Sequence, residues 1–296
     1  MEKRVWFSVR GLPWLLLAPQ LLVVGVFFFW PAGQALLQSM QQQDAFGASV
    51  TWVGGDNFRA LWTDATYLAS VKTTLLFGAL VSSLALTLGL ILAVFAERVL
   101  VGAAFYQSVL IIPYAVAPVV TGVLWTFMFS TSTGVVTQWL KSMGIPWNHL
   151  LNGDHAMALV VMAAVWKQIP YNFLFFLAGL HSVPKSLLEA AAMDGAGPWH
   201  RFWTMQLPLL SPTAFFLLVV NLVYAFFETF AVIDATTQGG PGRDTSTLVY
   251  RAYFDGFQGM DFGSAAAQSV VLMSLVIALT VIQFRFLERK VVYRAW

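Results

Sequence analysis

Long apolar runs separated by short polar stretches are the dominant pattern along this chain. A helix needs about 20 apolar residues to cross the roughly 30 Å hydrocarbon core of a bilayer. Runs of that length recur, and inside lipid each must be helical to satisfy its own backbone hydrogen bonds. The pattern predicts an all-α integral membrane protein with six transmembrane helices, at about residues 12–30, 73–96, 105–129, 156–180, 210–233 and 264–286.

The third run is the least regular of the six. Residues 99–140 carry no charged side chain, but they include Pro113, Pro118 and a polar stretch at 130–133. We place one helix at about 105–129 and an external loop after it. The first run follows Lys3 and Arg4 as in a signal peptide, yet no small-residue cleavage site follows, so we expect a retained anchor.

Composition supports a membrane protein. Hydrophobic residues make up 58% and charged residues 10% of the 296 positions, against roughly 45–50% and about 25% in soluble domains. The net charge of +2 gives no case for a nucleic-acid partner. The absence of cysteine excludes disulfides and thiolate metal sites. We therefore expect membrane lipid as the surroundings and a single transmembrane domain over residues 1–296.

The basic residues predict the orientation, because cytoplasmic loops carry an excess of Lys and Arg. One side would hold ten of the 16: Lys3, Arg4, Arg10, Arg98, Lys185, Arg201, Arg285, Arg289, Lys290 and Arg294. The opposite loops would hold five, namely Arg59, Lys72, Lys141, Arg243 and Arg251. Both termini and the loop at 181–210 are therefore expected in the cytoplasm.

The second span has Ala85, Gly89 and Ala93 at steps of four residues. Small residues at that spacing let two helices approach closely in a membrane. The spacing could equally reflect how common Ala and Gly are in such helices, and the sequence leaves both explanations open.

A polar island at residues 184–208 interrupts the apolar pattern. Pro184 suits a helix start, and Ser186 with Glu189 fits a capping box. Gly195, Gly197 and Pro198 would end that helix. A second short helix with Trp199, Phe202 and Trp203 would follow at the membrane interface, which predicts a helix–turn–helix elbow. Small alanine side chains could seat such an elbow in a groove of a soluble partner; the alternative is a simple interfacial connection between two spans.

The island also carries a spacing that is similar to a known signature, E-A-A-x3-G-x9-I-x-L-P. The chain has Met205 at the isoleucine position and matches at Glu189, Ala190, Ala191, Gly195, Leu207 and Pro208. This pattern resembles the cytoplasmic signature of permease subunits in bacterial binding-protein-dependent ABC importers. The resemblance implies that the elbow docks on an ATPase, whose ATP-driven closure swings the pore outward-open.

The resemblance covers nearly the whole chain. Segments such as 17–20, 30–33, 54–58 and 113–118 look like the maltose-type branch of the family. The strings at 166–176 and 221–228 are most similar to A-type permeases of sn-glycerol-3-phosphate importers. The expected cargo is therefore sn-glycerol-3-phosphate, with a sugar or oligosaccharide as the alternative.

The same resemblance implies an assembly in the bacterial cytoplasmic (inner) membrane. Its parts are a second homologous permease subunit, two cytoplasmic ATPase subunits and a periplasmic or lipoprotein substrate-binding protein. No phosphate loop G-x-x-x-x-G-K-[ST] occurs in this chain, so no cofactor is expected here, and ATP and Mg would be bound by the ATPases. The chain itself is expected to be non-catalytic.

Two charged residues, Lys167 and Glu228, lie inside the fourth and fifth predicted spans. A charge at the centre of a membrane helix costs about 2.5–3.5 kcal/mol on insertion scales, so it normally faces a cavity or a partner. One hypothesis is a substrate path formed by Lys167, Gln168, Asn172, Asn221, Tyr224 and Glu228. The alternatives are an ion pair between Lys167 and Glu228, or a solvent-exposed Glu228 near the outer boundary of the membrane.

An outer loop is the last candidate site. The resemblance implies contact with the binding protein at Gly239, Gly240, Pro241 and Arg243, while an ordinary glycine-rich turn remains the alternative. None of the histidines has a carboxylate or a second histidine at a spacing typical of metal ligands, so no metal site is expected. A secondary transporter or channel would show inverted repeats or a filter loop, and a membrane enzyme would show clustered catalytic groups; neither pattern is visible.

Overall fold

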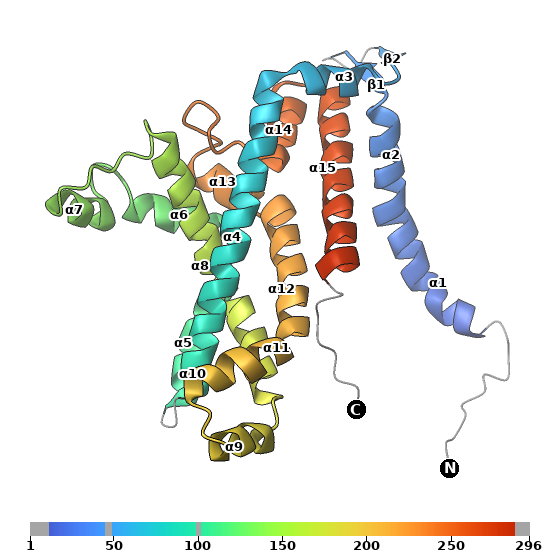
Figure 1. The fold of residues 1–296 in the computed structure, drawn as a ribbon. Coiled ribbons are helices and arrows are strands. Elements are labelled where there is room, and N and C mark those ends of the chain that lie inside the picture. The colour runs from blue at the N-terminus through green and yellow to red at the C-terminus, as the bar shows by residue number, and fades with distance from the viewer. Residues whose placement is uncertain (1–11, 45–48, 99–101, 288–296) are drawn as a thin grey trace. The chain divides into compact units, whose positions relative to one another are not determined.

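The structure is a computed structural model that describes residues 12–44, 49–98 and 102–287. Predictions about Lys3, Arg4, Arg10, Arg289 and Lys290, like that about Arg294, lie outside the described residues. Within them the chain is almost entirely helical (Figure 1). Contacts group it into two compact units, Met1–Thr63 with Ala252–Val271, and Asp64–Arg251 with Leu272–Trp296. The prediction of one domain over residues 1–296 stays a prediction.

In the first unit a continuous helical run extends over Leu12–Gln38. It consists of α1 (Leu12–Val24), a π-helical turn (Gly25–Phe29) and α2 (Trp30–Gln38). Its 18-residue apolar window has no buried residue, as expected of a helix that faces lipid. The run is longer than the predicted 12–30.

A short antiparallel hairpin and a helix follow in the same unit. Strands β1 (Gln41–Gln43) and β2 (Val50–Trp52) pair with Gln41 opposite Trp52. Helix α3 (Asp56–Thr63) comes next. Asn57 at its start donates from Nδ2 to the carbonyl oxygens of Ser39 and Gln41, at 2.9 Å each. These bonds tie α3 to the end of the first helical run.

Two long helices form the centre of the second unit. They are α4 (Ala65–Glu97) and α8 (Gly153–His181), which match the predicted spans 73–96 and 156–180 but are longer. Gly89 of α4 packs directly on α8, because a Cβ there would lie 2.5 Å from Asn172 Cβ. Ala85 and Ala93 beside it are fully buried. The small residues therefore do mark a close helix approach.

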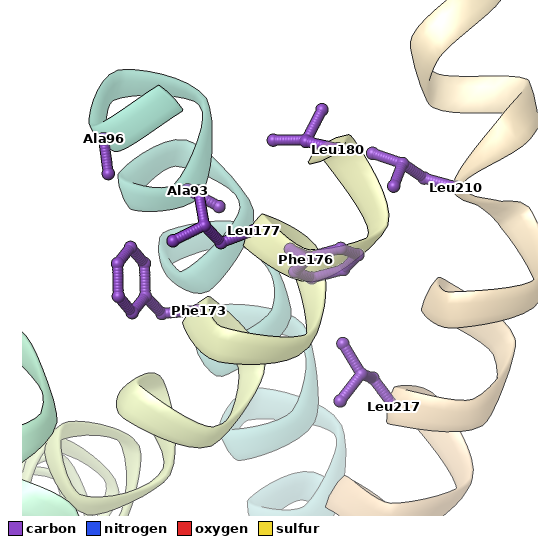
Figure 2. Close-up of a cluster of buried hydrophobic side chains, with 8 residues drawn as sticks. All are labelled: Ala93, Ala96, Phe173, Phe176, Leu177, Leu180, Leu210 and Leu217. Atoms are coloured by element: carbon purple, nitrogen blue, oxygen red, sulfur yellow. The ribbon is translucent and has the colours of Figure 1, made fainter. Parts of the chain in front are cut away.

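Apolar side chains fill the space where α8 meets α4 and the N-terminal part of α12 (Ser211–Val223, with Leu210 as its N-cap residue). Figure 2 shows these side chains projecting from the three helices toward one another. The cluster consists of Ala93, Ala96, Phe173, Phe176, Leu177, Leu180, Leu210 and Leu217. It lies next to the segment that leads from α8 into the polar island, so it fixes where that segment leaves the bundle.

The third predicted span is not one helix. Residues 105–129 form α5 (Ala103–Ala115) and α6 (Pro118–Met128), which are bent by 99°. Val116 and Ala117 between them have extended backbones, with ψ of 131° and 142°. Pro118 disfavours a helical conformation for the residue before it, and Pro113 removes a backbone donor. The prediction of a single helix was wrong because these prolines break the run.

The last two predicted spans are also irregular. The run at 210–233 continues from α12 into a π-helical turn (Tyr224–Glu228) and, after Thr229, into α13 (Phe230–Thr236). The run at 264–286 is α15 (Phe262–Ile282) followed by a π-helical turn (Gln283–Leu287). Among the described residues five helices are long and apolar enough to cross a membrane, or six with the bent pair.

The shorter helices lie between these spans. Helix α7 (Val135–Ser142) precedes α8, and α14 (Leu248–Tyr253) leads into a π-helical turn (Phe254–Gln258). The polar island contains α9 (Lys185–Met193), α10 (Pro198–Arg201), a π-helical turn (Phe202–Gln206) and α11 (Leu207–Leu209).

Candidate functional site: the polar island, the intramembrane polar residues and the outer loop

The turn after α9 requires a glycine. Gly195 has φ of +84°, in the left-handed region that other residues rarely adopt. Its N–H donates to Ala192 O at 3.1 Å, and the N–H of Ala196 donates to Ala191 O at 2.9 Å. This pair of bonds is a Schellman motif, which satisfies carbonyls at a helix end. A Cβ at 195 would meet nothing within 4 Å, so the backbone alone calls for glycine.

The start of α9 differs from the prediction. Pro184 is the N-cap residue and no side chain caps the helix. Ser186 therefore lies inside the first turn of α9. A capping box requires the serine at the N-cap position, where its hydroxyl accepts a hydrogen bond from the backbone N–H three residues later. The predicted capping box of Ser186 and Glu189 was wrong, although Pro184 does begin the helix as expected.

The signature residues of the island differ in exposure. Glu189, Ala190 and Gly195 are exposed, Ala191 is buried, and Leu207 and Pro208 are half-buried. Met193 on the same helix is 89% exposed. Helix α9 thus offers solvent small side chains and two large apolar ones, Leu187 and the more exposed Met193. Helix α10 is held to α9 by a hydrogen bond of 3.1 Å from Arg201 Nη1 to Leu188 O.

Lys167 lies at the break between α5 and α6. Its Nζ donates to Val116 O at 2.6 Å and to Tyr114 O at 3.2 Å. These are the carbonyls that the broken helix leaves without partners. No ion pair joins Lys167 to Glu228 in the described part of the chain, and Glu228 is exposed. This conformation therefore does not contain the ion pair, and the ion-pair alternative stays a prediction.

Asn172 of α8 and Asn221 of α12 form a closed amide pair. Asn172 Nδ2 donates to Asn221 Oδ1 at 3.0 Å, and Asn221 Nδ2 donates to Asn172 Oδ1 at 2.7 Å. Each also donates to the carbonyl four residues earlier in its own helix. Both side chains are fully buried, and all their N–H donors are used. In this conformation they join two helices.

The other predicted path residues on these helices are also buried. Gln168 is 5% exposed, and Tyr224 is 5% exposed with its hydroxyl 3.4 Å from Ala164 O. A substrate path along this face would require the Asn172–Asn221 pair to separate. The path through Lys167, Gln168, Asn172, Asn221, Tyr224 and Glu228 stays a prediction.

The outer loop has an ordered base and an exposed tip. Thr245 Oγ1 donates to Gly240 O at 2.8 Å, and the Thr237 and Thr245 hydroxyls lie 2.7 Å apart. Gly239, with φ of +76°, packs on the Tyr250 ring, where a Cβ would lie 2.7 Å from Cε1. Pro241 is half-buried, whereas Arg243 is exposed. The hydrogen bonds at the base of the loop, around Gly239 and Gly240, therefore hold its exposed tip at Arg243 in a defined position.

One partly buried ion pair, between Arg251 and Asp64, was not predicted from the sequence. Arg251, 8% exposed, donates from Nη2 to Asp64 Oδ2 at 2.9 Å and from Nη1 to Thr66 Oγ1 at 2.8 Å. Burial raises the pKa of the Asp64 carboxyl, but hydrogen bonds from Thr66 and the charge of Arg251 outweigh it and leave the pKa below its usual value. The sequence signal that could have drawn attention to Asp64 is its position directly before α4, because Asp is a preferred N-cap residue.

Comparison with known proteins identifies the family. The pattern described as "Binding-protein-dependent transport system inner membrane component" matches residues 85–293, which is most of the chain. The chain belongs to the permease family of binding-protein-dependent transport systems. The resemblance of the island signature to this family is thereby confirmed.

Relatives of this permease match over its whole length. The "sn-glycerol-3-phosphate transport system permease protein UgpA" of Yersinia enterocolitica is 58% identical over 293 residues, covering 99% of each chain. That of Rhizobium meliloti is 55% identical over 291 residues, covering 98% of this chain and 99% of its own.

A solved structure shows the same fold. The crystal structure of a bacterial ABC transporter involved in import of the acidic polysaccharide alginate matches with a TM-score of 0.79. The match covers 93% of this permease and 96% of that chain at 23% identity. The predicted class, an all-α protein with several membrane spans, is confirmed.

Family membership settles three coarser expectations. The permease is a multi-pass protein of the inner membrane, and its transport system uses a substrate-binding protein. It is a non-catalytic transport subunit, so a secondary transporter, a channel and a membrane enzyme are excluded. The described residues include no group of three or more His, Asp or Glu that could hold a metal ion.

Proposed function

We propose that this permease forms half of the translocation pore of an ATP-driven importer for sn-glycerol-3-phosphate. The observation that carries the cargo is its similarity, 58% over 99% of both chains, to a permease named for that substrate. Similarity of this extent includes every span as well as the loops. The second half of the pore would be a homologous permease subunit.

The coupling to ATP is proposed for the polar island. Two cytoplasmic ATPase subunits would bind ATP and Mg, and one of them would receive α9. The exposed surface of Glu189, Ala190 and Met193 supports this role, because small side chains allow close seating while a large apolar one fills a pocket. The buried Ala191 and the half-buried Leu207 and Pro208 would hold the island against the rest of the chain.

The orientation follows from the same proposal. The island would face the cytoplasm together with both termini. The loop of Gly239, Gly240, Pro241 and Arg243 would then face the periplasm and contact the substrate-binding protein. The ordered base of this loop supports the role, since a tip held in one place loses little conformational entropy on binding.

A sugar or oligosaccharide is the second candidate cargo. The observation in its favour is the bonding of Lys167, which directs its ammonium at two backbone carbonyls. It is the one Lys or Arg well inside a predicted span, since Arg285 lies at the end of the last one. An uptake assay separates the two cargoes: cells that express the permease with its partner subunits should accumulate radiolabelled sn-glycerol-3-phosphate, and unlabelled maltose should not compete. Uptake of labelled maltose without uptake of labelled sn-glycerol-3-phosphate would favour the sugar.

Replacing Gly195 tests the coupling role. Gly195→Ala forces a left-handed backbone on alanine, which costs about 1–2 kcal/mol, and should distort the turn after α9. We expect at least a fivefold loss of the ATPase that co-purifies with the permease, at unchanged membrane insertion. Gly197→Ala is the matched control, because its φ is −65° and a Cβ there meets nothing within 4 Å. Equal recovery of ATPase with both variants would refute the coupling role without touching the cargo.

A further inference from the structure

A half-open apolar cleft of about 700 Å³ extends along one side of α4. Leu86, Leu90, Val94 and Arg98 line it at steps of four residues, so they form one stripe on that helix. The other walls of the cleft are formed by Phe176 of α8, by Phe202 of the π-helical turn in the island, and by Ala214 of α12. Apart from Thr87 and Arg98, the lining side chains are aliphatic or aromatic.

The length of the cleft matches one leaflet of a bilayer. At 1.5 Å per residue, the stripe from Leu86 to Arg98 is about 18 Å long. Half of the roughly 30 Å hydrocarbon core is about 15 Å. Arg98 follows directly on the last residue of α4, so the basic group marks one end of the cleft. The stripe thus has an apolar part of leaflet depth and a cationic end.

A smaller polar cavity of about 400 Å³ adjoins this end. Arg98 lines both cavities, and Arg201, Glu97 and Leu188 line the smaller one. Two arginines against one glutamate leave a surplus of one positive charge. Arg201 donates from Nη1 to Leu188 O, while its buried Nε has no hydrogen-bond partner among the described residues. A buried donor without an acceptor is costly, and an anion placed here would supply one.

Tryptophan side chains lie at the same end of the cleft. Trp199 is 72% exposed and Trp203 is 51% exposed, and their rings meet edge to face at 5.8 Å. Amphipathic rings of this kind concentrate at the headgroup level of a membrane. The aromatic and basic residues thus indicate the same boundary between hydrocarbon and headgroups.

We propose that this permease binds an anionic phospholipid here, with an acyl chain in the cleft and the phosphate group at Arg98 and Arg201. Free phosphate would leave the apolar walls unfilled. A zwitterionic lipid would add no net charge to offset the surplus positive one. The arginine fork suits a phosphate, because it donates two parallel hydrogen bonds. Such a lipid would connect α4 to residues 198–206, the second half of the island.

Photolabelling of the full-length permease tests the site. The protein is purified in phosphatidylcholine nanodiscs and exposed to phosphatidylglycerol with a diazirine on one acyl chain. Labelled peptides should come from residues 86–98 and 198–206. Unlabelled phosphatidylglycerol should suppress this label at a concentration about fivefold lower than phosphatidylcholine does. Inorganic phosphate at the same concentrations should have no effect.

Variants separate the charge from the cleft. Arg98→Gln and Arg201→Gln should each weaken competition by phosphatidylglycerol about fivefold. Ala214→Phe should abolish labelling of 86–98 by filling the cleft. Arg59→Gln is the control, because Arg59 is an exposed helical arginine that does not line the cleft.

Several results would overturn the proposal. One is equal competition by the two lipids, which would show a general lipid surface. Another is displacement of the label by inorganic phosphate, which would show a site for a free anion. A third is loss of the label when the partner permease is bound, which would assign the cleft to a protein. The wild-type competition needs no variant, so misfolding of Ala214→Phe leaves the test intact.

Discussion

Lys167 has a structural role that its charge alone did not suggest. A cation within a span normally indicates a cargo or an acidic partner, yet this ammonium is directed at the carbonyls of Tyr114 and Val116. Those carbonyls lie at the C-terminal end of α5, where the chain bends into α6. Lys167 therefore stabilises the break between α5 and α6.

Lys167→Met should destabilise the permease. The substitution keeps most of the side-chain length but removes hydrogen bonds to a charged donor, worth about 2 kcal/mol. We expect a lower melting temperature by intrinsic tryptophan fluorescence in detergent. Lys141→Met is the control, because Lys141 also donates to a backbone carbonyl, Thr131 O, but at an exposed site. A Lys167→Met protein that melts like wild type and loses only transport would instead support a direct contact with cargo.

The Asn172–Asn221 pair should behave as one unit. Asn172→Leu or Asn221→Leu alone leaves a buried amide without its partner, at a cost of about 2 kcal/mol. The double variant should cost less than the sum, with a coupling energy of about 1 kcal/mol. The measurement is a double-mutant cycle on unfolding in detergent. A cycle of Asn172→Leu with Thr121→Val is the control, since Thr121 bonds within its own helix; equal coupling in both cycles would contradict the pairing.

At the scale of single elements, Gly89 sets how closely α4 and α8 approach. A Cβ there would lie 2.5 Å from Asn172 Cβ and 3.1 Å from Phe173 N, and the latter is backbone that cannot rotate away. Gly89→Leu should therefore cost about 1–3 kcal/mol through overpacking, read as a lower melting temperature. Gly33→Leu in α2 should change little, because nothing lies within 4 Å of its Cβ position. The same loss in both variants would show a general effect of replacing helical glycine.

The apolar runs located the spans because hydrophobic length is a local property of the sequence. What the runs did not show was how each helix ends or bends. Pro118 was visible, but a proline in a membrane helix permits either a mild kink or a full break. The choice between them depends on Lys167, a residue more than 50 positions away that bonds the freed carbonyls.

The candidate sites were predictable to different degrees. The coupling signature depends on fixed spacing along one segment, so Gly195 and its turn were found from sequence alone. The polar face of α8 and α12 was also found, but not that Asn172 and Asn221 satisfy each other. Nor was the bond between Asp64 and Arg251 predicted, because the two residues lie 187 positions apart. Long-range pairing leaves no local pattern.

At the scale of the whole molecule, the orientation in the membrane can be tested directly. The chain has no cysteine, so single cysteines report without background. Asp194→Cys lies beside the turn after α9, and Arg243→Cys lies at the tip of the outer loop; both positions are exposed. An impermeant maleimide should label the first only in inverted vesicles and the second only in spheroplasts. The reverse pattern would place the island in the periplasm and end the coupling proposal.

The bend between α5 and α6 has an electrostatic consequence for the cargo. The C-terminal end of a helix carries about half a negative elementary charge from its aligned peptide dipoles. Lys167 is bonded to carbonyls at and just beyond that end of α5, so the field of the ammonium is partly cancelled where it arises. A passing phosphate ester would therefore experience much less than a full positive charge from this half of the pore. In the proposed importer, its attraction would have to come mainly from the second permease subunit or from the substrate-binding protein.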